Sequence, residues 1–175
     1  MKNIFAKSSF LLIASITFLF TGCGYHMGSL MHPQIKTIAI APVTNNTMEY
    51  NLSAYMRQAL SEEFCRDASL KVKSQEQADC ILYCKVTKVK NTSTGMEDST
   101  DNEITYRPAE WSIELTVEFT VVIPGRPEPL ITTREVTQAA TYQVMNDQVT
   151  ARTNGLKQAC RSVSEDVVEF TTEAW

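Results

Sequence analysis

The sequence predicts a two-layer α/β sandwich of the α+β kind, in which a mixed sheet of about four strands carries two helices on one face. Three patterns lead to this prediction. Apolar and polar residues alternate from Trp111 to Ile123, which is typical of a long strand with one buried and one wet face. Apolar residues recur every three or four positions at 52–64 and again at 149–170, which is typical of amphipathic helices. The expected order is β-α-β-β-β-α.

The first half of the chain supplies a strand and a helix. Residues 35–43 form a short, β-prone apolar run, and Pro42 near its end suits a strand terminus. After a turn, Asn51 or Ser53 is expected to cap a helix that runs to about Arg66. Because a further strand follows this helix, we expect a right-handed crossover between parallel strands.

The next strand is expected at residues 80–90, after a brief strand piece at 70–73. Its alternation places four residues on one face: Cys80, Leu82, Cys84 and Val86. Residues 91–102 are polar and have no apolar period, so they are expected to form a loop.

The last two strands are expected to form an antiparallel hairpin, with a turn at 124–127 between residues 111–123 and 130–145. Arg134 falls among the inward-facing positions of the second strand, and the sequence gives no reason for a charge there. Asp147 is expected to cap the final helix. The sheet face opposite the two helices, rich in Thr and Glu, is left to solvent or a partner.

The chain begins with the features of a secretory signal. Lys2 and Lys7 precede an apolar run at residues 10–20, which is followed by the small residues Thr21 and Gly22. The run is too short to cross a bilayer as a helix, which takes roughly 20 apolar residues. Residues 1–22 are therefore expected to be a signal peptide.

Residues 20–23, Phe-Thr-Gly-Cys, resemble the bacterial lipobox. The resemblance implies that Cys23 becomes the mature N-terminus and carries diacylglycerol and an acyl chain. Gly24, where no acidic residue stands, is similar to the sorting pattern for the outer membrane. An ordinary secreted protein with a chance cysteine at the cleavage site is the alternative.

The mature chain is expected to be a lipidated tether at residues 23–34 followed by a single domain at 35–175, which is long enough to bury a core. Loss of Lys2 and Lys7 takes the formal net charge from −4 to −6. An acidic chain is a poor general binder of nucleic acid, so no nucleic-acid partner is expected. Any anionic ligand needs a local basic patch.

The cysteines after Cys23 are disulfide candidates, because an exported chain meets an oxidising compartment. They are Cys65, Cys80, Cys84 and Cys160. Cys80 and Cys84 share one strand face, so a bridge between them would distort the strand. The preferred pairings join Cys65 or Cys160 to Cys80 or Cys84. Buried free thiols are the alternative, and no metal site is expected because paired CxxC spacing is lacking.

The sequence offers little for catalysis, and no enzyme is expected. Both histidines lie in the tether, and there is no GxSxG, HExxH or glycine-rich phosphate loop. Glu110, Glu114 and Glu118 share a strand face and are most simply a solvated row.

Several segments, in this order, resemble the LptE family of lipopolysaccharide-assembly lipoproteins. Residues 23–28, Cys-Gly-Tyr-His-Met-Gly, look like the family's CGYhxxG start. Residues 38–47, IAIAPVTNNT, are similar to its strand-turn-helix segment, and Ala78-Asp79 matches its AD stretch. Tyr142 and the closing segment that ends at Trp175 are similar to the family's late tyrosine and last helix.

The resemblance implies a non-enzymatic lipoprotein on the periplasmic side of the outer membrane. It implies that the protein partners and plugs the LptD β-barrel, supports barrel assembly and contacts lipopolysaccharide on its way outward. It implies no cofactor other than the covalent lipid on Cys23.

Lipopolysaccharide phosphates would need Lys or Arg donors. Lys88 and Lys90 end one expected strand and Arg107 precedes the next, so these three residues are the candidate ligands. A hydrated strand end is the alternative. Two other functions stay open: a different envelope lipoprotein, such as a peptidoglycan-synthase activator or a secretion-channel component, and a lipoprotein that binds a small ligand.

Overall fold

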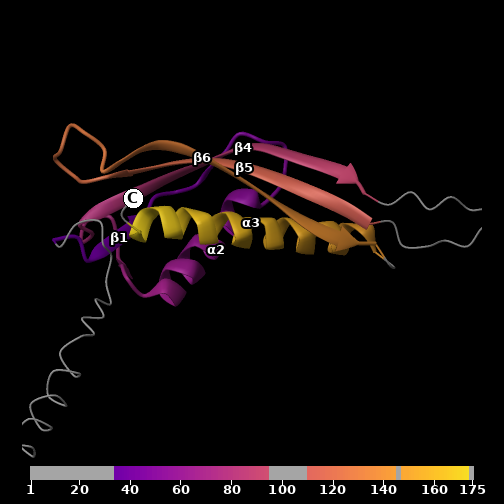
Figure 1. Ribbon diagram of the computed structural model, residues 1–175, viewed down its shortest axis with the longest axis horizontal. Helices are drawn as coiled ribbons and strands as arrows, with labels where there is room; N and C mark the ends of the chain where they lie inside the picture. The colour runs from indigo at the N-terminus through magenta and orange to yellow at the C-terminus, as the bar shows by residue number, and fades with distance from the viewer. Residues whose placement is uncertain (1–33, 95–109, 145–146, 174–175) are drawn as a thin grey trace, which may run out of the picture.

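The computed structural model describes residues 34–94, 110–144 and 147–173, which form a sheet with two helices beneath it (Figure 1). The signal segment, Cys23, Arg107 and Trp175 lie outside the described residues. The elements are β1 (Thr37–Ile40), β2 (Thr44–Asn45), α2 (Leu52–Asp67), β3 (Lys71–Val72), β4 (Cys80–Ser93), β5 (Glu110–Val122), β6 (Ile131–Gln143) and α3 (Gln148–Thr172). The predicted sandwich is confirmed, with six strands in the sheet rather than about four.

The strand order is β3-β1-β4-β5-β6, and β2 pairs with β4 beyond the end of β1. β1 runs parallel to both of its neighbours, with Ile38 opposite Val72 on one side and Cys80 on the other. β4, β5 and β6 are antiparallel to one another. The predicted parallel start and antiparallel final hairpin are therefore confirmed.

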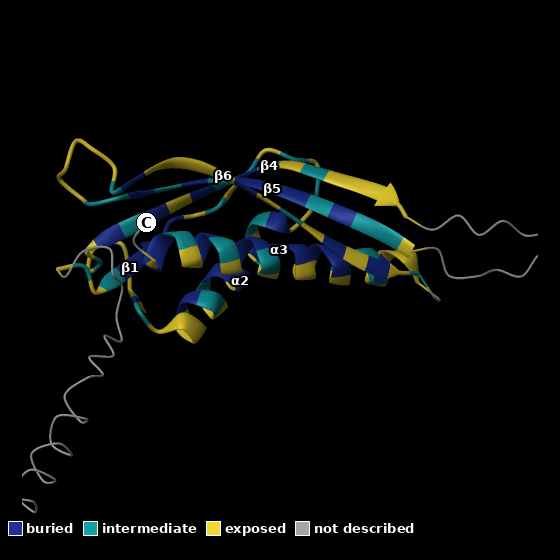
Figure 2. Ribbon diagram, in the orientation of Figure 1, coloured by how far each residue is buried: buried dark blue, intermediate teal, exposed yellow. Residues whose placement is uncertain are grey.

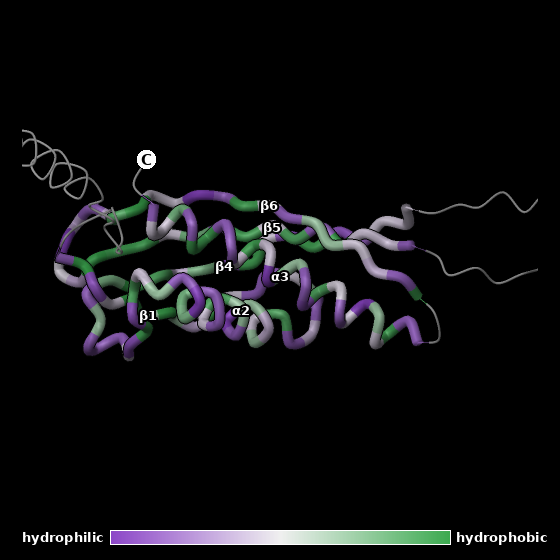
Figure 3. Tube along the Cα trace, turned by 60° about the horizontal axis from the view of Figure 1, so that its bottom comes forward, coloured by the Kyte–Doolittle hydropathy of each residue, from purple (hydrophilic) through white to green (hydrophobic). Residues whose placement is uncertain are grey.

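The core lies between the sheet and the helices, where Figure 2 shows the buried residues gathered. Both layers contribute to this core. Hydrophobic and hydrophilic residues alternate along the strands, and they form separate stripes on both helices (Figure 3). The largest fully buried side chains are Phe64, Phe119, Ile38, Leu52, Met56, Leu60, Leu82, Ile113 and Leu115. The inner faces predicted for β4, β5 and α2 supply most of them.

A bulge in β4 changes which face its second half presents. The register passes from Val86 opposite Val117 to Lys88 opposite Thr116, so Thr87 is an extra residue. Because side chains alternate along a strand, one extra residue moves every later side chain to the other face. β4 continues to Ser93, so the prediction of a loop was wrong for the first residues after 90.

A second irregularity, near the start of β6, accounts for Arg134. Four residues of β6, from Ile131 to Arg134, span the same length as three of β5, from Val121 to Phe119. Arg134 stays on the helix side, but β6 is the last strand of the sheet, so its side chain remains exposed. Its guanidinium carbon lies 5.3 Å from the ring centroid of Phe170, which is stacked on Phe119 at 6.5 Å. Arg134 thus covers an aromatic pair at the edge of the core.

The two helices begin in different ways. Asp147 caps α3 as predicted, and its carboxylate accepts a hydrogen bond from Val149 N at 2.9 Å. Asn51 occupies the cap position of α2, but its backbone is left-handed, at φ 59°, and its side chain makes no capping hydrogen bond. The side-chain cap expected for α2 is therefore absent at Asn51.

Candidate functional site

The two candidate lysines lie together on the outer face of the sheet, away from the helices. In an uninterrupted strand, Lys88 and Lys90 would share a face with Cys84 and Val86, which are buried. The bulge at Thr87 turns both lysines outward, and both are exposed. The sequence put Lys88 and Lys90 on one face, but nothing in it signalled the bulge.

The outer face carries charges in columns that follow the strands. Lys85, Lys88 and Lys90 stand on β4, whereas Glu114 and Glu118 stand on the adjacent β5. Lys85 Nζ lies 3.4 Å from Glu118 Oε2, and both side chains are more than one-third exposed, so this pair contributes little stability. Within the described part of the chain, neither Lys88 nor Lys90 makes a salt bridge. Lys90 stands directly opposite Glu114 on β5.

Hydroxyl groups fill the face beside these charges. Thr137 Oγ1 on β6 donates to Thr116 Oγ1 on β5 at 3.0 Å, and Thr120 Oγ1 donates to the carbonyl of Ile131 at 2.8 Å. Glu118 stands directly opposite Glu135 on β6, and a like-charge pair of this kind is destabilising in an isolated sheet. The face is thus polar over much of its area, with a basic side on β4 and an acidic side on β5 and β6, and Tyr83 of β4 is exposed on it as well.

Asp79 joins the start of β1 to the start of β4. Its Oδ2 accepts hydrogen bonds from Lys36 N and Thr37 N, each at 3.0 Å, and from Thr37 Oγ1 at 2.8 Å. Thr37 Oγ1 in turn accepts from Asp79 N at 2.9 Å. The backbone amide of Lys36, followed by the Thr37 hydroxyl, lowers the pKa of this carboxyl below its ordinary value. The Ala78-Asp79 motif therefore has a structural role, because it pins two parallel strands in register.

The turn between β2 and α2 is braced in a similar way. Asn45 Oδ1 accepts from Thr47 N at 2.9 Å and from Thr47 Oγ1 at 2.7 Å, while Asn45 Nδ2 donates to the carbonyl of Glu49 at 2.8 Å. The Glu49 carboxylate makes a two-pronged ion pair with Arg152 on α3, in which Nη1 lies 2.9 Å from Oε2. These contacts hold Met48 and Tyr50 in solvent, 103% and 85% exposed. The sequence analysis did not single out this projecting apolar pair.

The four cysteines of the domain have free thiols in this structure, three buried and Cys65 exposed. Burial raises the pKa of Cys80 to about 11 and the pKa values of Cys84 and Cys160 to about 12. The nearby Cys160 thiol adds to the effect on Cys84. Disulfide formation therefore stays a prediction, with the choice of partner open.

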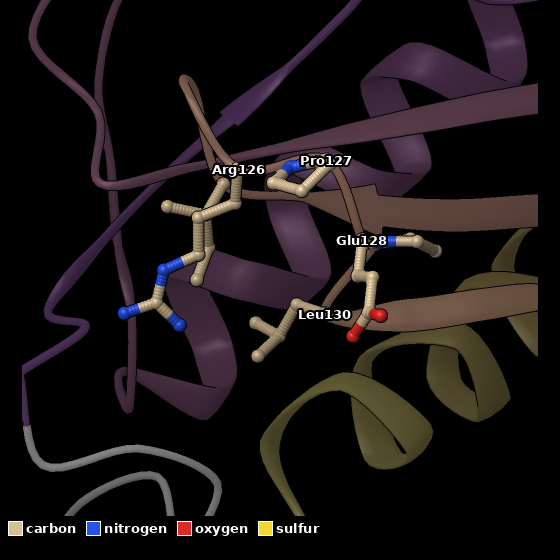
Figure 4. A pocket seen from close by; sticks show the side chains of 6 residues that line it. Arg126, Pro127, Glu128 and Leu130 are labelled. Atoms are coloured by element: carbon tan, nitrogen blue, oxygen red, sulfur yellow. The ribbon is translucent and has the colours of Figure 1, made fainter.

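Two hollows stand out on the described residues, and neither is a deep cleft. The larger, about 260 Å³, lies inside the β5–β6 turn and is lined by Ile123, Arg126, Pro127, Glu128, Pro129 and Leu130. Figure 4 shows the charged ends of Arg126 and Glu128 pointing apart. In the parts of the chain that the structure covers, no cluster of His, Cys, Asp or Glu could hold a metal ion, and no helix is long and apolar enough to cross a bilayer.

One protein family and several solved structures resemble this chain. The family model described as LptE, Lipopolysaccharide-assembly, matches residues 35–170. No curated protein matches the sequence.

Solved structures share the fold at low sequence identity. A protein from Xanthomonas campestris has a TM-score of 0.54 at 13% identity, covering 81% of this chain and 88% of its own. A PelC dodecamer from Paraburkholderia phytofirmans has a TM-score of 0.51 at 11% identity, covering 85% and 95%. A minor lipoprotein from Acinetobacter baumannii has a TM-score of 0.50 at 10% identity, covering 79% and 93%. These likenesses support the fold alone.

Proposed function

The chain belongs to the lipopolysaccharide-assembly family LptE, and from this membership we propose that it partners and plugs an LptD-type β-barrel of the outer membrane. In this role it assists barrel assembly and the transport of lipopolysaccharide to the cell surface, without catalysing a reaction. The observation that carries the proposal is the family match over residues 35–170, which takes in nearly the whole domain.

The outer sheet face fits the inside of a barrel. The lumen of an outer-membrane barrel is polar and water-filled, and this face presents threonine hydroxyls and ion-paired side chains such as Lys85 and Glu118. A polar face loses little free energy when it meets a polar wall across ordered water. The apolar face of the sheet is already buried under α2 and α3.

The lipid anchor is part of the same proposal. Thioether-linked and amide-linked acyl chains on Cys23 hold the domain at the periplasmic leaflet, since several chains anchor firmly where one is marginal. The tether from Cys23 to residue 34 spans at most roughly 40 Å when extended. That reach keeps the domain beside the barrel that encloses it.

We further propose that Lys88 and Lys90 bind lipopolysaccharide phosphates, with Arg107 as a third donor. Lys88→Glu together with Lys90→Glu should weaken binding of purified lipopolysaccharide, measured by titration calorimetry. Lys71→Glu together with Lys73→Glu is the matched control, because it reverses two exposed lysines at the opposite end of the sheet. Equal binding by both double variants and the wild type would disprove the lysine site and leave the barrel partnership standing.

Co-purification after gentle detergent extraction tests the partnership itself. We expect a large β-barrel protein to elute with the full chain in constant proportion. Recovery of a peptidoglycan synthase, or of a self-assembled ring like the PelC dodecamer, would support a different envelope lipoprotein. Recovery of the protein alone would contradict the proposed function. Incorporation of labelled fatty acid, lost in Cys23→Ala, tests the anchor separately.

A further inference from the structure

β6 leaves an unusually unprotected edge at one side of the sheet. Its only partner is β5, so the backbone groups on its other side pair with no strand of the described chain. Natural proteins protect such edges with lysines, prolines, bulges or inward-pointing charges. β6 has a bulge and Arg134 near its start, but the run from Val136 to Gln143 contains no charge, proline or glycine. A regular, uncharged edge of this length is a template for another strand.

A second unpaired stretch of the sheet, along the second half of β4, shows the contrast. β1 and β2 end before the second half of β4, so β4 is unpaired on that side from Lys88 to Ser93. This edge follows the bulge at Thr87 and carries Lys88 and Lys90, which are the devices that discourage strand addition. The unpaired stretch of β4 is thus protected against strand addition and the β6 edge is not, which indicates that the β6 edge pairs with a strand of another chain.

We propose that the Val136–Gln143 edge pairs with the same segment of a second copy of this chain, antiparallel and about a two-fold axis through Ala139. The two sheets then join into one continuous sheet, a self-matching contact typical of two-fold dimers. The pairs across the axis are Glu135 with Gln143, Val136 with Tyr142, Thr137 with Thr141, and Gln138 with Ala140. The proposal does not depend on the barrel partnership.

The side chains favour this register over its neighbours. Opposite residues of an antiparallel pair share a face, so the two-fold axis must pass through a residue. An axis at Arg134 or Glu135 would set like charges against each other, and an axis at Thr137 would draw in the bulged start of the strand. An axis moved by one residue, to Gln138 or Ala140, would set Thr137 against Ala139 or Gln143. The axis at Ala139 sets Thr137 against Thr141 on the exposed face, which is a favourable cross-strand pair, whereas Val136 and Tyr142 are already buried within their own protomer.

The helix layer is compatible with this contact. α3 lies beneath β6, and Gln138 Nε2 donates to Asp166 Oδ2 at 2.6 Å. The Asp166 carboxylate therefore already has a partner within its own protomer. Dimerisation hides the edge whenever no barrel encloses the domain, and so protects the free protein from edge-to-edge aggregation.

Disulfide trapping in the bacterial envelope tests the register directly. The full chain carries Cys65→Ser, which removes the exposed thiol, together with Ala139→Cys. In the proposed dimer the new cysteine faces its own copy, with Cα atoms about 4.5–5.5 Å apart, inside the range for a disulfide. Exchange with an oxidised envelope thiol oxidoreductase transfers two electrons to that protein's disulfide and links the two sulfurs. We expect a dimer band on a non-reducing gel that disappears with reductant.

A matched control lies two residues away on the same exposed face. Thr141→Cys in the same background faces Thr137 of the second copy and should give no linked dimer. Co-expression of Thr137→Cys with Thr141→Cys chains should restore the dimer. Equal linkage by Ala139→Cys and Thr141→Cys alone would mean random collision and overturn the proposal. Linkage of Ala139→Cys to a different protein would mean that another strand covers the edge, and would overturn it too.

Sedimentation of the purified full chain gives a second readout that needs no cross-link. Ala139→Lys sets two ammonium groups opposite each other and should convert the dimer to monomer. Glu135→Lys adds positive charge on the same face, opposite the neutral Gln143, and should leave the dimer intact. Unchanged circular dichroism confirms that both variants fold. A wild type that sediments as monomer would overturn the proposal, whatever protein co-purifies in the separate barrel experiment.

Discussion

Replacement of Gly155 by alanine sets two effects of similar size against each other. Glycine inside a helix is about 1 kcal/mol less favourable than alanine, so helix propensity alone predicts that Gly155→Ala stabilises α3. The packing predicts the opposite. A Cβ atom at this position would lie 2.8 Å from Tyr142 Cδ1, 3.1 Å from Tyr142 Cγ and 3.3 Å from Ile113 Cδ1.

The tyrosine ring has little freedom to move away. Tyr142 is 7% exposed, and its hydroxyl exchanges hydrogen bonds with the side chain of Asn91, at 3.0 Å and 3.3 Å. Overpacking of a confined site costs about 1–3 kcal/mol. With a midpoint of about 2 kcal/mol for that cost and a gain of about 1 kcal/mol from propensity, we expect Gly155→Ala to lower the free energy of unfolding by about 1 kcal/mol.

Urea denaturation followed by circular dichroism measures this difference. Asn154→Ala is the control, because residue 154 is the exposed neighbour on the same helix and should gain a few tenths of a kcal/mol. Gly155→Ala should also be tolerated better when combined with Tyr142→Leu, which removes the ring. A stabilisation of about 1 kcal/mol by Gly155→Ala in the otherwise unchanged chain would refute the close approach of α3 to the sheet.

Three further predictions follow from individual contacts. The pKa of Asp79 is lowered in the folded state, so its contribution to folding stability is complete above its ordinary pKa of 3.8 and is lost as pH falls. Asp79→Asn should therefore reduce stability at pH 7 more than at pH 3 in thermal melts. An equal loss at both pH values would contradict this. Buried thiols with raised pKa values contribute fully to folding stability below about pH 9 and lose that contribution as pH rises towards 11–12. The reduced domain should therefore lose stability above pH 9, and iodoacetamide at pH 8 should label Cys65 ahead of the other cysteines. Rapid labelling of several thiols in the folded protein would contradict this. Arg134→Ala should destabilise by about 0.5–1 kcal/mol, as expected for an exposed cation over an aromatic ring, and Arg134→Lys should retain part of this, whereas an effect as large in a Phe170→Leu background would exclude the ring as the cause.

The regular alternation of the long strands could be predicted from the sequence because it depends only on neighbouring residues. Val117 and Phe119 were assigned to the inner face of β5 from the period of two, and both are buried. The same reasoning held for β4 as far as Val86. It failed beyond that point because a bulge depends on how two strands pair, and no residue near Thr87 marks it.

The contacts that organise the candidate site were out of reach for a related reason. Asp79 meets Thr37 across 42 positions of the sequence, and Glu49 meets Arg152 across 103. Local patterns carry no information about such pairs. Arg134 was noticed as an anomaly, but its explanation needed Phe170, which lies on an element that the sequence could not place beside it.

Two residues of the segments that carry the family resemblance, Asn45 and Asp79, are engaged within the fold itself. The Asn45 side chain is occupied by Thr47 and Glu49, and Asp79 is occupied by the start of β1. Their side chains therefore have a structural role in the domain. The proposed ligand site is elsewhere, on the outer face at Lys88 and Lys90, which make no salt bridge within the described residues. Asp79→Asn should lower stability while the folded fraction still binds lipopolysaccharide. Charge reversal at Lys88 and Lys90 should weaken that binding while stability is kept. The two kinds of variant therefore distinguish residues that stabilise the fold from residues that bind the ligand.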